Sequence, residues 1–338
     1  GLHVQHQHHY LVWSLMNDLQ SVISTCDFVD LFVSNSFADV KGLAGVSDSR
    51  VPVPDTWKDD VAVILELCGV GQGDAGGPEF SILHSKVVYR VTHLDSNEPG
   101  GAYVLRRSKA EIRNFRGIGI PSYYADALLD PKAIGLALIC GGFGVGKTST
   151  GASWVVARHE MHGGVSLAIE DPIETAIDGL HGNGRCIAIN ASRHKGGYRE
   201  HLIRGLRSGV DFIFLGEIRD SETAYEALKA GSNGELIVAT FHAGSIPQAL
   251  ERLISLAEEH TASAAKLLAD SLLGVMWQDL AIEKSQGGTD FKRLTLSTLL
   301  VRGESASGVR EKIRSGKIQS LSQDVDQQAA QAIWGKEK

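Results

Sequence analysis

The sequence lacks the features that mark several common classes of protein. Its four cysteines are scattered and none forms a CxxC pair, which argues against a disulfide framework or a zinc ribbon and is typical of a reducing compartment. No apolar run is long enough to span a bilayer, and no signal peptide is recognised. The net charge of −7 gives no general attraction to nucleic acid or anionic lipid. These absences predict a cytoplasmic protein.

The first part of the chain is predicted to form a small domain. At 338 residues the chain is long enough for two domains. After a histidine-rich start and helical apolar spacing over residues 10–22, the pattern changes to short strand-like runs, namely "DLFVS", "VAVILEL", "FSILHSKVVYRVTHL" and "AYVLRR". We therefore predict an α+β domain over residues 1–107, and a linker or hinge over the charged residues 108–121.

The remainder, residues 122–338, has the rhythm of a parallel α/β domain. Four apolar runs are each followed by a turn and a helical pattern: "AIGLALICGG", "GVSLAIEDP", "VDFIFLGE" and "GELIVATFHA". Continuous apolar strands that alternate with helices indicate a mostly parallel sheet covered on both faces. From about residue 261 to 338 the pattern is mostly helical, with a possible hairpin around "QGGTDFKRLTLSTLLV".

The strongest signal is a phosphate-binding loop between the first of these runs and its helix. "GGFGVGKT", residues 141–148, satisfies GxxxxGK followed by Thr. Glycines let backbone N–H groups wrap phosphates, Lys147 reaches the β- and γ-phosphates, and the Thr148 hydroxyl binds Mg²⁺. We predict ATP and Mg²⁺ as ligands. The predicted nucleotide-binding residues are Gly141, Gly142, Phe143, Gly144, Val145, Gly146, Lys147, Thr148 and Ser149.

Polar side chains close three other apolar runs. Glu217 follows "DFIFL" and is placed to hold Mg²⁺ or orient water, and His242 ends "IVATFH", where contact with a γ-phosphate is favoured over core packing. "SLAIEDPIET" carries Glu170, Asp171 and Glu174 at the end of a buried run. Taken alone, this acidic end is equally consistent with simple polar capping and with acid–base chemistry.

These motifs, in this order, resemble those of the secretion ATPases of the type II/type IV superfamily. That superfamily includes PilT-like pilus retraction motors and the DotB/TraJ-like ATPases of type IVB secretion and conjugation. "YRVTHL…GGAYVLRR" is similar to the arginine-bearing end of their PAS-like N-terminal domain. "LLADSLLGVMWQDL" and "GVREKIRSGK" resemble the C-terminal helices of PilT-like proteins, and the tetracysteine insert of the type II branch is absent. The resemblance implies a RecA-like P-loop NTPase domain, preceded by a PAS-like domain.

The resemblance also implies roles for individual residues. Glu174 is the expected general base for water, Glu217 the acid after the Walker B strand, and His242 the His-box histidine. Arg90 and Arg106 are expected near the phosphates. The family implies a homo-hexameric ring that acts at the cytoplasmic face of the bacterial inner membrane with platform proteins of a pilus, secretion or conjugation machine, and no direct, specific nucleic-acid partner.

Two other functions remain open from the sequence. One is a nucleotide-gated scaffold that binds ATP with little turnover, against which the combination of Glu174, Glu217 and His242 argues. The other is a RecA-like nucleic-acid translocase, against which the net charge of −7 and the lack of a base-stacking stripe argue.

Overall fold

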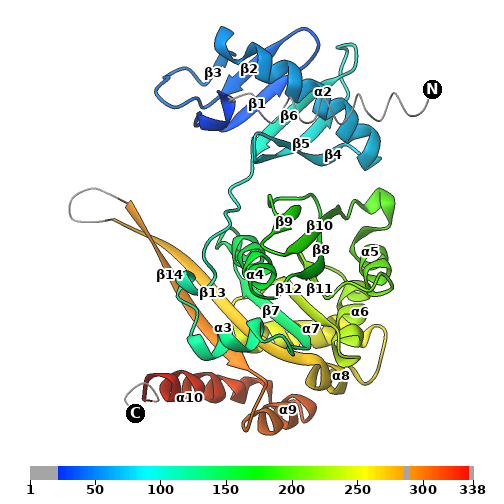
Figure 1. The fold of residues 1–338 in the computed structure, drawn as a ribbon, viewed down its shortest axis with the longest axis vertical. Helices are drawn as coiled ribbons and strands as arrows, with labels where there is room; N and C mark the ends of the chain where they lie inside the picture. Colours follow the sequence, from blue (N-terminus) through cyan, green and yellow to red (C-terminus); the bar gives the residue numbers. More distant parts are fainter. Residues whose placement is uncertain (1–21, 285–289, 335–338) are drawn as a thin grey trace. The chain divides into compact units, whose positions relative to one another are not determined.

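The computed structural model describes residues 22–284 and 290–334, which form two compact units (Figure 1). The first unit runs to residue 109 and also includes residues 171–176 and 190–195, whereas the second holds residues 110–170, 177–189 and 196 onward. The histidine-rich start and almost all of the helix predicted over residues 10–22 lie outside the described residues.

A six-stranded antiparallel sheet is the frame of the first unit, in the order β3-β2-β1-β6-β5-β4. Alternate strand residues such as Leu31, Val33, Tyr89 and Val91 are buried and form one core with helix α2. The elements are η1 (Ile23–Thr25), β1 (Asp30–Val33), β2 (Ala38–Lys41), β3 (Arg50–Pro52), η2 (Asp55–Trp57), α2 (Lys58–Ala75), β4 (Glu79–His84), β5 (Val87–Leu94) and β6 (Ala102–Arg107).

Helix α2 corrects one prediction, because the strand expected for "VAVILEL" lies inside this helix. Val61, Ile64, Leu65 and Cys68 recur at helical spacing, and Ile64 and Cys68 are fully buried. A short, continuously apolar run fits a buried strand and a buried helix equally well, so the run alone could not decide between them. The helix ends at Gly76, which has a φ of 66° that glycine adopts readily.

The second unit has an eight-stranded sheet in the order β14-β13-β7-β12-β11-β8-β10-β9. Strands β13, β7, β12, β11 and β8 run parallel to one another, which confirms the predicted mostly parallel sheet. The strands are β7 (Gly135–Gly141), β8 (Gly164–Glu170), β9 (Gly179–His181), β10 (Gly184–Asn190), β11 (Phe212–Leu215), β12 (Leu236–His242), β13 (Leu272–Lys284) and β14 (Asp290–Leu300).

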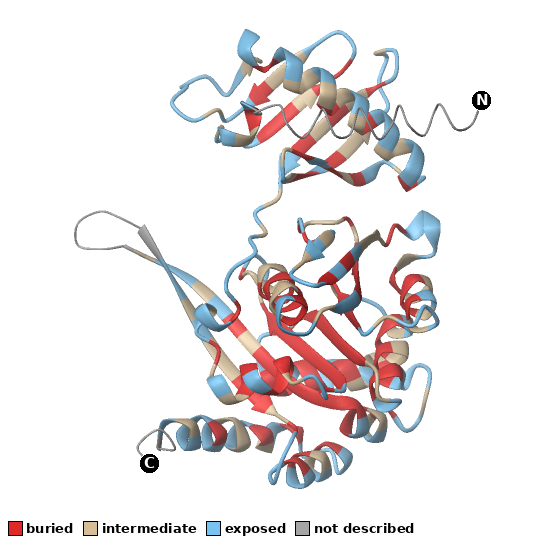
Figure 2. Ribbon diagram, viewed as in Figure 1, coloured by how far each residue is buried: buried red, intermediate tan, exposed pale blue. Residues whose placement is uncertain are grey.

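Helices cover both faces of this sheet, whose central strands are almost wholly buried (Figure 2). Neighbouring residues of β11 point to opposite faces: Phe214 packs against Gly151 of α4, and Ile213 against Gly205 of α5. The helices are η3 (Arg116–Ile118), α3 (Ser122–Leu129), α4 (Lys147–His162), η4 (Arg193–Lys195), α5 (Gly197–Leu206), α6 (Ser221–Ser232), α7 (Ile246–Glu258), α8 (Ala264–Ser271), α9 (Ala306–Arg314), η5 (Ile318–Ser320) and α10 (Leu321–Trp334); η4 lies in a segment grouped with the first unit.

The C-terminal part contains helices as predicted, but one of them is shorter than expected. Helices α8, α9 and α10 are present, but the helix expected across "LLADSLLGVMWQDL" ends at Ser271 and gives way to β13. β13 then forms the expected hairpin with β14, pairing antiparallel from Gly274 opposite Leu300. The residues at the start of β13, through Met276, are buried between β7 and β14, so apolar surface on both sides favours a strand here. Over residues 22–284 and 290–334, we find no helix with the length and apolar character needed to cross a bilayer.

Candidate nucleotide-binding site

The glycine-rich loop lies where the central parallel strand β7 meets helix α4. β7 ends at Gly141 and α4 begins at Lys147. Gly144 and Gly146 have φ angles of 72° and 88°, in the left-handed region that L side chains rarely adopt. Phe143, at the exposed tip of the loop, leaves 84% of its surface accessible. The loop therefore has the turn that the motif predicts, and its two left-handed residues explain the need for glycine.

The start of α4 can attract an anion. Its N-cap residue, Gly146, has no side chain to bind the first-turn N–H groups, and these groups have no partner within the helix. The Lys147 ammonium donates to the carbonyl oxygens of Gly141 and Gly142, at 3.2 and 2.5 Å, so its side chain folds back across the loop. The loop, the helix end and Lys147 together fit the phosphates of a nucleotide.

The side chain of Gln278, in β13, forms hydrogen bonds with the loop and with α4, a role that the sequence motif did not predict. The side chain is almost fully buried, its Nε2 donates to the Val145 carbonyl at 2.7 Å, and its Oε1 accepts from the Thr150 hydroxyl at 2.9 Å. A Cβ on Gly141 would meet the Gln278 carbonyl oxygen at 2.3 Å, so glycine is also required for this close approach. The only local signal was a glutamine within an apolar run.

His242 lies beside the loop as predicted from its place at a strand end. It pairs with Gly141 across the parallel strands β12 and β7, and its ring stacks on Phe143 with the centroids 4.1 Å apart. The Nδ1 atom of His242 is buried and has no hydrogen-bond partner in the described part of the chain. The imidazole is therefore not a satisfied core histidine.

Glu217 follows β11, the strand beside β12. One of its carboxylate oxygens accepts from Arg219 Nε at 2.6 Å. The preceding residue, Gly216, is held on both sides: its N–H donates to the Ile169 carbonyl of β8 at 2.7 Å, and its carbonyl accepts from the Thr240 hydroxyl of β12. A side chain on Gly216 would press on Glu170, which is itself buried. Contacts with β8 and β12 thus fix the backbone of Gly216 at the end of β11, and with it the position from which the Glu217 side chain extends.

Glu174 belongs by its contacts to the first unit. Its Oε1 accepts from Arg90 Nη1 at 3.1 Å, and its carbonyl accepts from the Ser108 hydroxyl at 2.6 Å. Arg106 binds the buried Asp30 through two hydrogen bonds, at 2.8 and 3.1 Å. The structure thus groups Lys147, His242 and Glu217 in one unit, and Glu174, Arg90 and Arg106 in the other.

The remaining predicted residues bear on metal binding. Thr148 follows Lys147 in the first turn of α4, and the next hydroxyl, Ser149 Oγ, accepts from the Glu111 N–H at 3.0 Å. Across the described residues no group of three or more His, Cys, Asp or Glu side chains is placed to hold a metal ion. Thr148 and Glu217 are the residues predicted from the sequence to hold Mg²⁺.

Comparison with known families matches residues 78–322 to the family described as Type II/IV secretion system protein. The chain belongs to this family. The superfamily resemblance carried by the motifs is therefore confirmed, including its PilT-like character.

Two curated relatives of this type II/IV secretion family member illustrate the match. The Escherichia coli protein YggR is 32% identical over 225 residues, covering 66% of this chain and 65% of YggR. The type IV pilus ATPase PilT of Pseudomonas aeruginosa is 28% identical over 236 residues, covering 69% of this chain and 64% of PilT. In both cases the match spans slightly less than two thirds of the relative.

Solved structures of the family share the fold over a larger part of the chain. The pilus retraction motor PilT with bound ADP has a TM-score of 0.69 at 25% identity, covering 91% of this chain and 88% of that one. The ATPase DotB of Legionella pneumophila has a TM-score of 0.65 at 17% identity, covering 88% of this chain and 84% of DotB, and this likeness concerns the fold alone.

Proposed function

We propose that this family member hydrolyses ATP and converts the energy into motion. The observation that carries the proposal is the loop of residues 141–148. Lys147 and Gln278 donate hydrogen bonds to its carbonyl oxygens, and the His242 ring stacks on Phe143 at its tip. PilT, PilB and DotB are named as ATPases, which supports the same activity here.

We assign a separate role in the reaction to each of the predicted site residues. Backbone N–H groups of the loop and the start of α4 bind the β- and γ-phosphates, and Lys147 neutralises charge that develops on the transferred phosphoryl group. Thr148 and Glu217 would hold Mg²⁺, which would supply further charge neutralisation when bound. The His242 imidazole, beside the loop tip, contacts the γ-phosphate, and the carboxylate of Glu174 accepts a proton from the attacking water.

Arg90 and Arg106 have supporting roles in this proposal. Arg90 donates to Glu174 Oε1 and so orients the proposed base. Arg106 is tied to Asp30 by a two-point hydrogen bond, which is a rigid geometry for a guanidinium group. We assign both cations to the phosphates of a bound nucleotide, and residues 108–121 to a hinge.

Steady-state hydrolysis and nucleotide binding test the assignment together. Glu174→Gln should bind ATP normally but hydrolyse it about 100-fold or more slowly, since a positioned base contributes about that factor. Lys147→Ala should lose binding as well. Glu79→Gln, at an exposed carboxylate of the first unit, is the matched control and should behave as the parent protein.

Substantial hydrolysis by Glu174→Gln would refute the general-base role. Tight ATP binding without turnover by the parent chain would favour the nucleotide-gated scaffold, and hydrolysis stimulated by DNA would favour the translocase.

The machine that uses this motor is the second part of the proposal. We place the chain as a homo-hexamer on the cytoplasmic face of the bacterial inner membrane, bound to platform proteins of a type IV pilus, secretion or conjugation machine. The family relation and the PilT-like fold support this. The native mass of the purified chain with and without ATP tests the ring, and a mass that stays at one subunit in both conditions contradicts it.

A further inference from the structure

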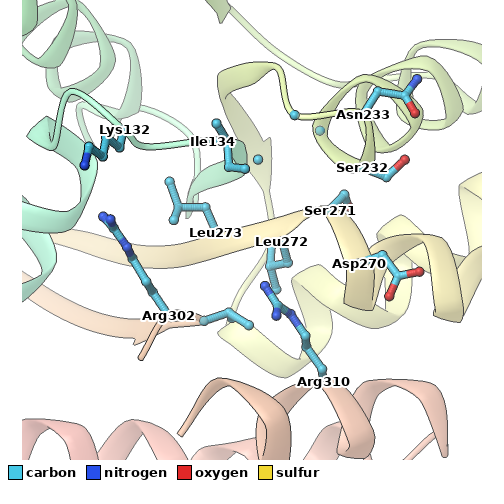
Figure 3. A pocket seen from close by; sticks show the side chains of 14 residues that line it. Lys132, Ile134, Ser232, Asn233, Asp270, Ser271, Leu272, Leu273, Arg302 and Arg310 are labelled. Carbon is cyan, nitrogen blue, oxygen red and sulfur yellow. The ribbon is translucent and has the colours of Figure 1, made fainter. Parts of the chain in front are cut away.

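A pocket lies in the second unit, at the end of β7 that is opposite the glycine-rich loop. It has a volume of about 330 Å³. Its walls come from the start of β7, the turn after α6, the junction of α8 and β13, the end of β14 and helix α9 (Figure 3). Gly135 lines this pocket and Gly141 ends the same strand at the loop, so the two sites lie at opposite ends of β7. The proposed ATPase mechanism uses none of its residues.

Positive charge dominates the pocket lining. Lys132, Arg302 and Arg310 line it, and Asp270 is the one carboxylate among the residues that form its wall. Arg302 also donates through Nη2 to Asp130, which lies outside the lining, at 2.8 Å. Asp270 is already bound by two cations outside the lining, Lys266 at 2.8 Å and Arg314 at 2.6 Å. The hydrogen bond from Lys266 has the larger effect and that from Arg314 the next; both lower the pKa of Asp270 and keep it ionised at neutral pH. The carboxylate therefore cannot neutralise the lining cations as well.

Arg310 carries the most specific signal in the pocket. Its Nε atom is buried and has no hydrogen-bond partner among the described residues. Figure 3 shows its side chain extending from α9 toward Leu272, while Arg302 reaches past Leu273 from the end of β14. A buried cationic donor without a partner is costly, and a partner that carries negative charge removes that cost.

The other walls suggest the size and character of the partner. Leu272, Leu273 and the exposed side chain of Ile134 give an apolar surface beside the cations, and Asn233, at the end of α6, lines the pocket as well (Figure 3). A volume of this size is larger than one inorganic ion needs and lies at the lower end of the range for small-molecule sites.

We propose that this pocket binds a small organic anion. Arg310 holds its phosphate or carboxylate group together with the N–H groups of Arg302 that do not bind Asp130, since a guanidinium group matches the geometry of a phosphate and of a carboxylate. Leu273 and Ile134 contact its apolar part. The pocket is thus a second ligand site, at the end of the sheet away from the nucleotide loop, and it does not depend on the chain being an ATPase.

Titration calorimetry with phenyl phosphate, benzoate and neutral phenol tests the site on the full chain. We expect phenyl phosphate, benzoate or both to bind saturably and phenol to bind much more weakly, and the tighter of the two anions identifies the preferred group. Arg310→Gln and Arg302→Gln should each weaken binding about tenfold or more, because each removes a charge-assisted hydrogen bond.

Two controls separate the pocket from other sources of binding. Lys317→Gln removes an exposed cation just beyond α9 and should leave the affinity unchanged, which excludes a general effect of net charge. Lys147→Ala disables the nucleotide loop and should also leave it unchanged. Thermal melts confirm that each variant is folded. The proposal is overturned if neither anion binds at millimolar concentrations, if phenol binds as well as the anions, or if both folded arginine variants retain full affinity.

Discussion

Gln278 shows how one side chain outside a motif can fix the motif's geometry. The contacts of its amide join β13 to the loop at Val145 and to the second turn of α4 at Thr150. Both contacts are made in a nearly water-free environment, where a hydrogen bond fixes geometry well and a missing partner is costly. We therefore assign Gln278 as a positioning residue for the phosphate-binding loop.

Gln278→Leu should weaken nucleotide binding about fivefold to tenfold, since it removes two hydrogen bonds and leaves the Val145 carbonyl without this donor. Gln328→Leu is the matched control. Gln328 is also buried and lies far along the chain from the loop. Its Oε1 accepts from the Leu300 N–H and its Nε2 donates to the Leu300 carbonyl, each at 2.8 Å. Both variants should lower the melting temperature, but only Gln278→Leu should change the Kd for a fluorescent nucleotide.

An equal loss of nucleotide affinity in both variants would mean that Gln278 acts through general stability alone. Unchanged affinity in Gln278→Leu would show that the loop keeps its conformation without the amide.

How much of the site could be predicted depends on the range of each contact. The loop residues are consecutive, and Glu217 and His242 could be predicted because parallel strands end at the same edge of a sheet. Gln278 lies 133 positions beyond Val145, so no local spacing could connect them. The pairing of Arg90 with Glu174 is also non-local, and from the sequence only the family resemblance brought these two residues into one site.

At the scale of elements, the parallel strands were predicted well because each apolar run is short and ends in a turn. The errors at α2 and β13 have one cause. Each element contains a short, continuously apolar run that fits a strand and a helix equally well, so the run alone does not decide between them. What decided them was the tertiary surroundings: α2 packs by one face on an antiparallel sheet, whereas β13 is inserted between β7 and β14.

The contact of α4 with the sheet depends on a glycine in the middle of the helix. A Cβ on Gly151 would lie 2.2 Å from a ring carbon of Phe214, so the helix approaches β11 more closely than a side chain would allow. Phe214 is fully buried in the core of this unit and has little room to move.

Gly151→Ala should therefore destabilise the protein by about 1–3 kcal/mol, as overpacking of a core does, although alanine favours helix. Gly308→Ala in α9 is the matched control: apart from its chain neighbours and the helix backbone around it, no described atom lies within 4 Å of its added Cβ, so the intrinsic helix preference should stabilise the protein by about 0.5–1 kcal/mol. Urea unfolding followed by circular dichroism should give midpoints that move in opposite directions. If Gly151→Ala raises the midpoint, the contact with Phe214 is not tight.

At the scale of the whole molecule, the two units have separate hydrophobic cores, and cysteines are distributed between them. Cys26 and Cys68 are in the first unit, and Cys140 and Cys186 in the second. Cys26 is partly exposed, whereas the other three are buried. Burial raises the pKa of Cys68 and of Cys186 to about 12, and raises the pKa of Cys140 further. These three thiols therefore stay protonated and inert at neutral pH, since the thiolate is the reactive form.

This arrangement predicts that a thiol reagent labels one cysteine rapidly in the native protein and all four in denaturant. Cys26→Ser should abolish the rapid phase and leave the slow phases unchanged. Because Cys68 reports on one core and Cys140 and Cys186 on the other, peptide mapping of the slow label at increasing urea follows the opening of each unit separately. If the units unfold independently, Cys68 becomes reactive at a different urea concentration from the other two, and a shared midpoint means cooperative unfolding. Rapid native labelling of Cys140 would contradict the burial of β7, the strand that carries the phosphate-binding loop.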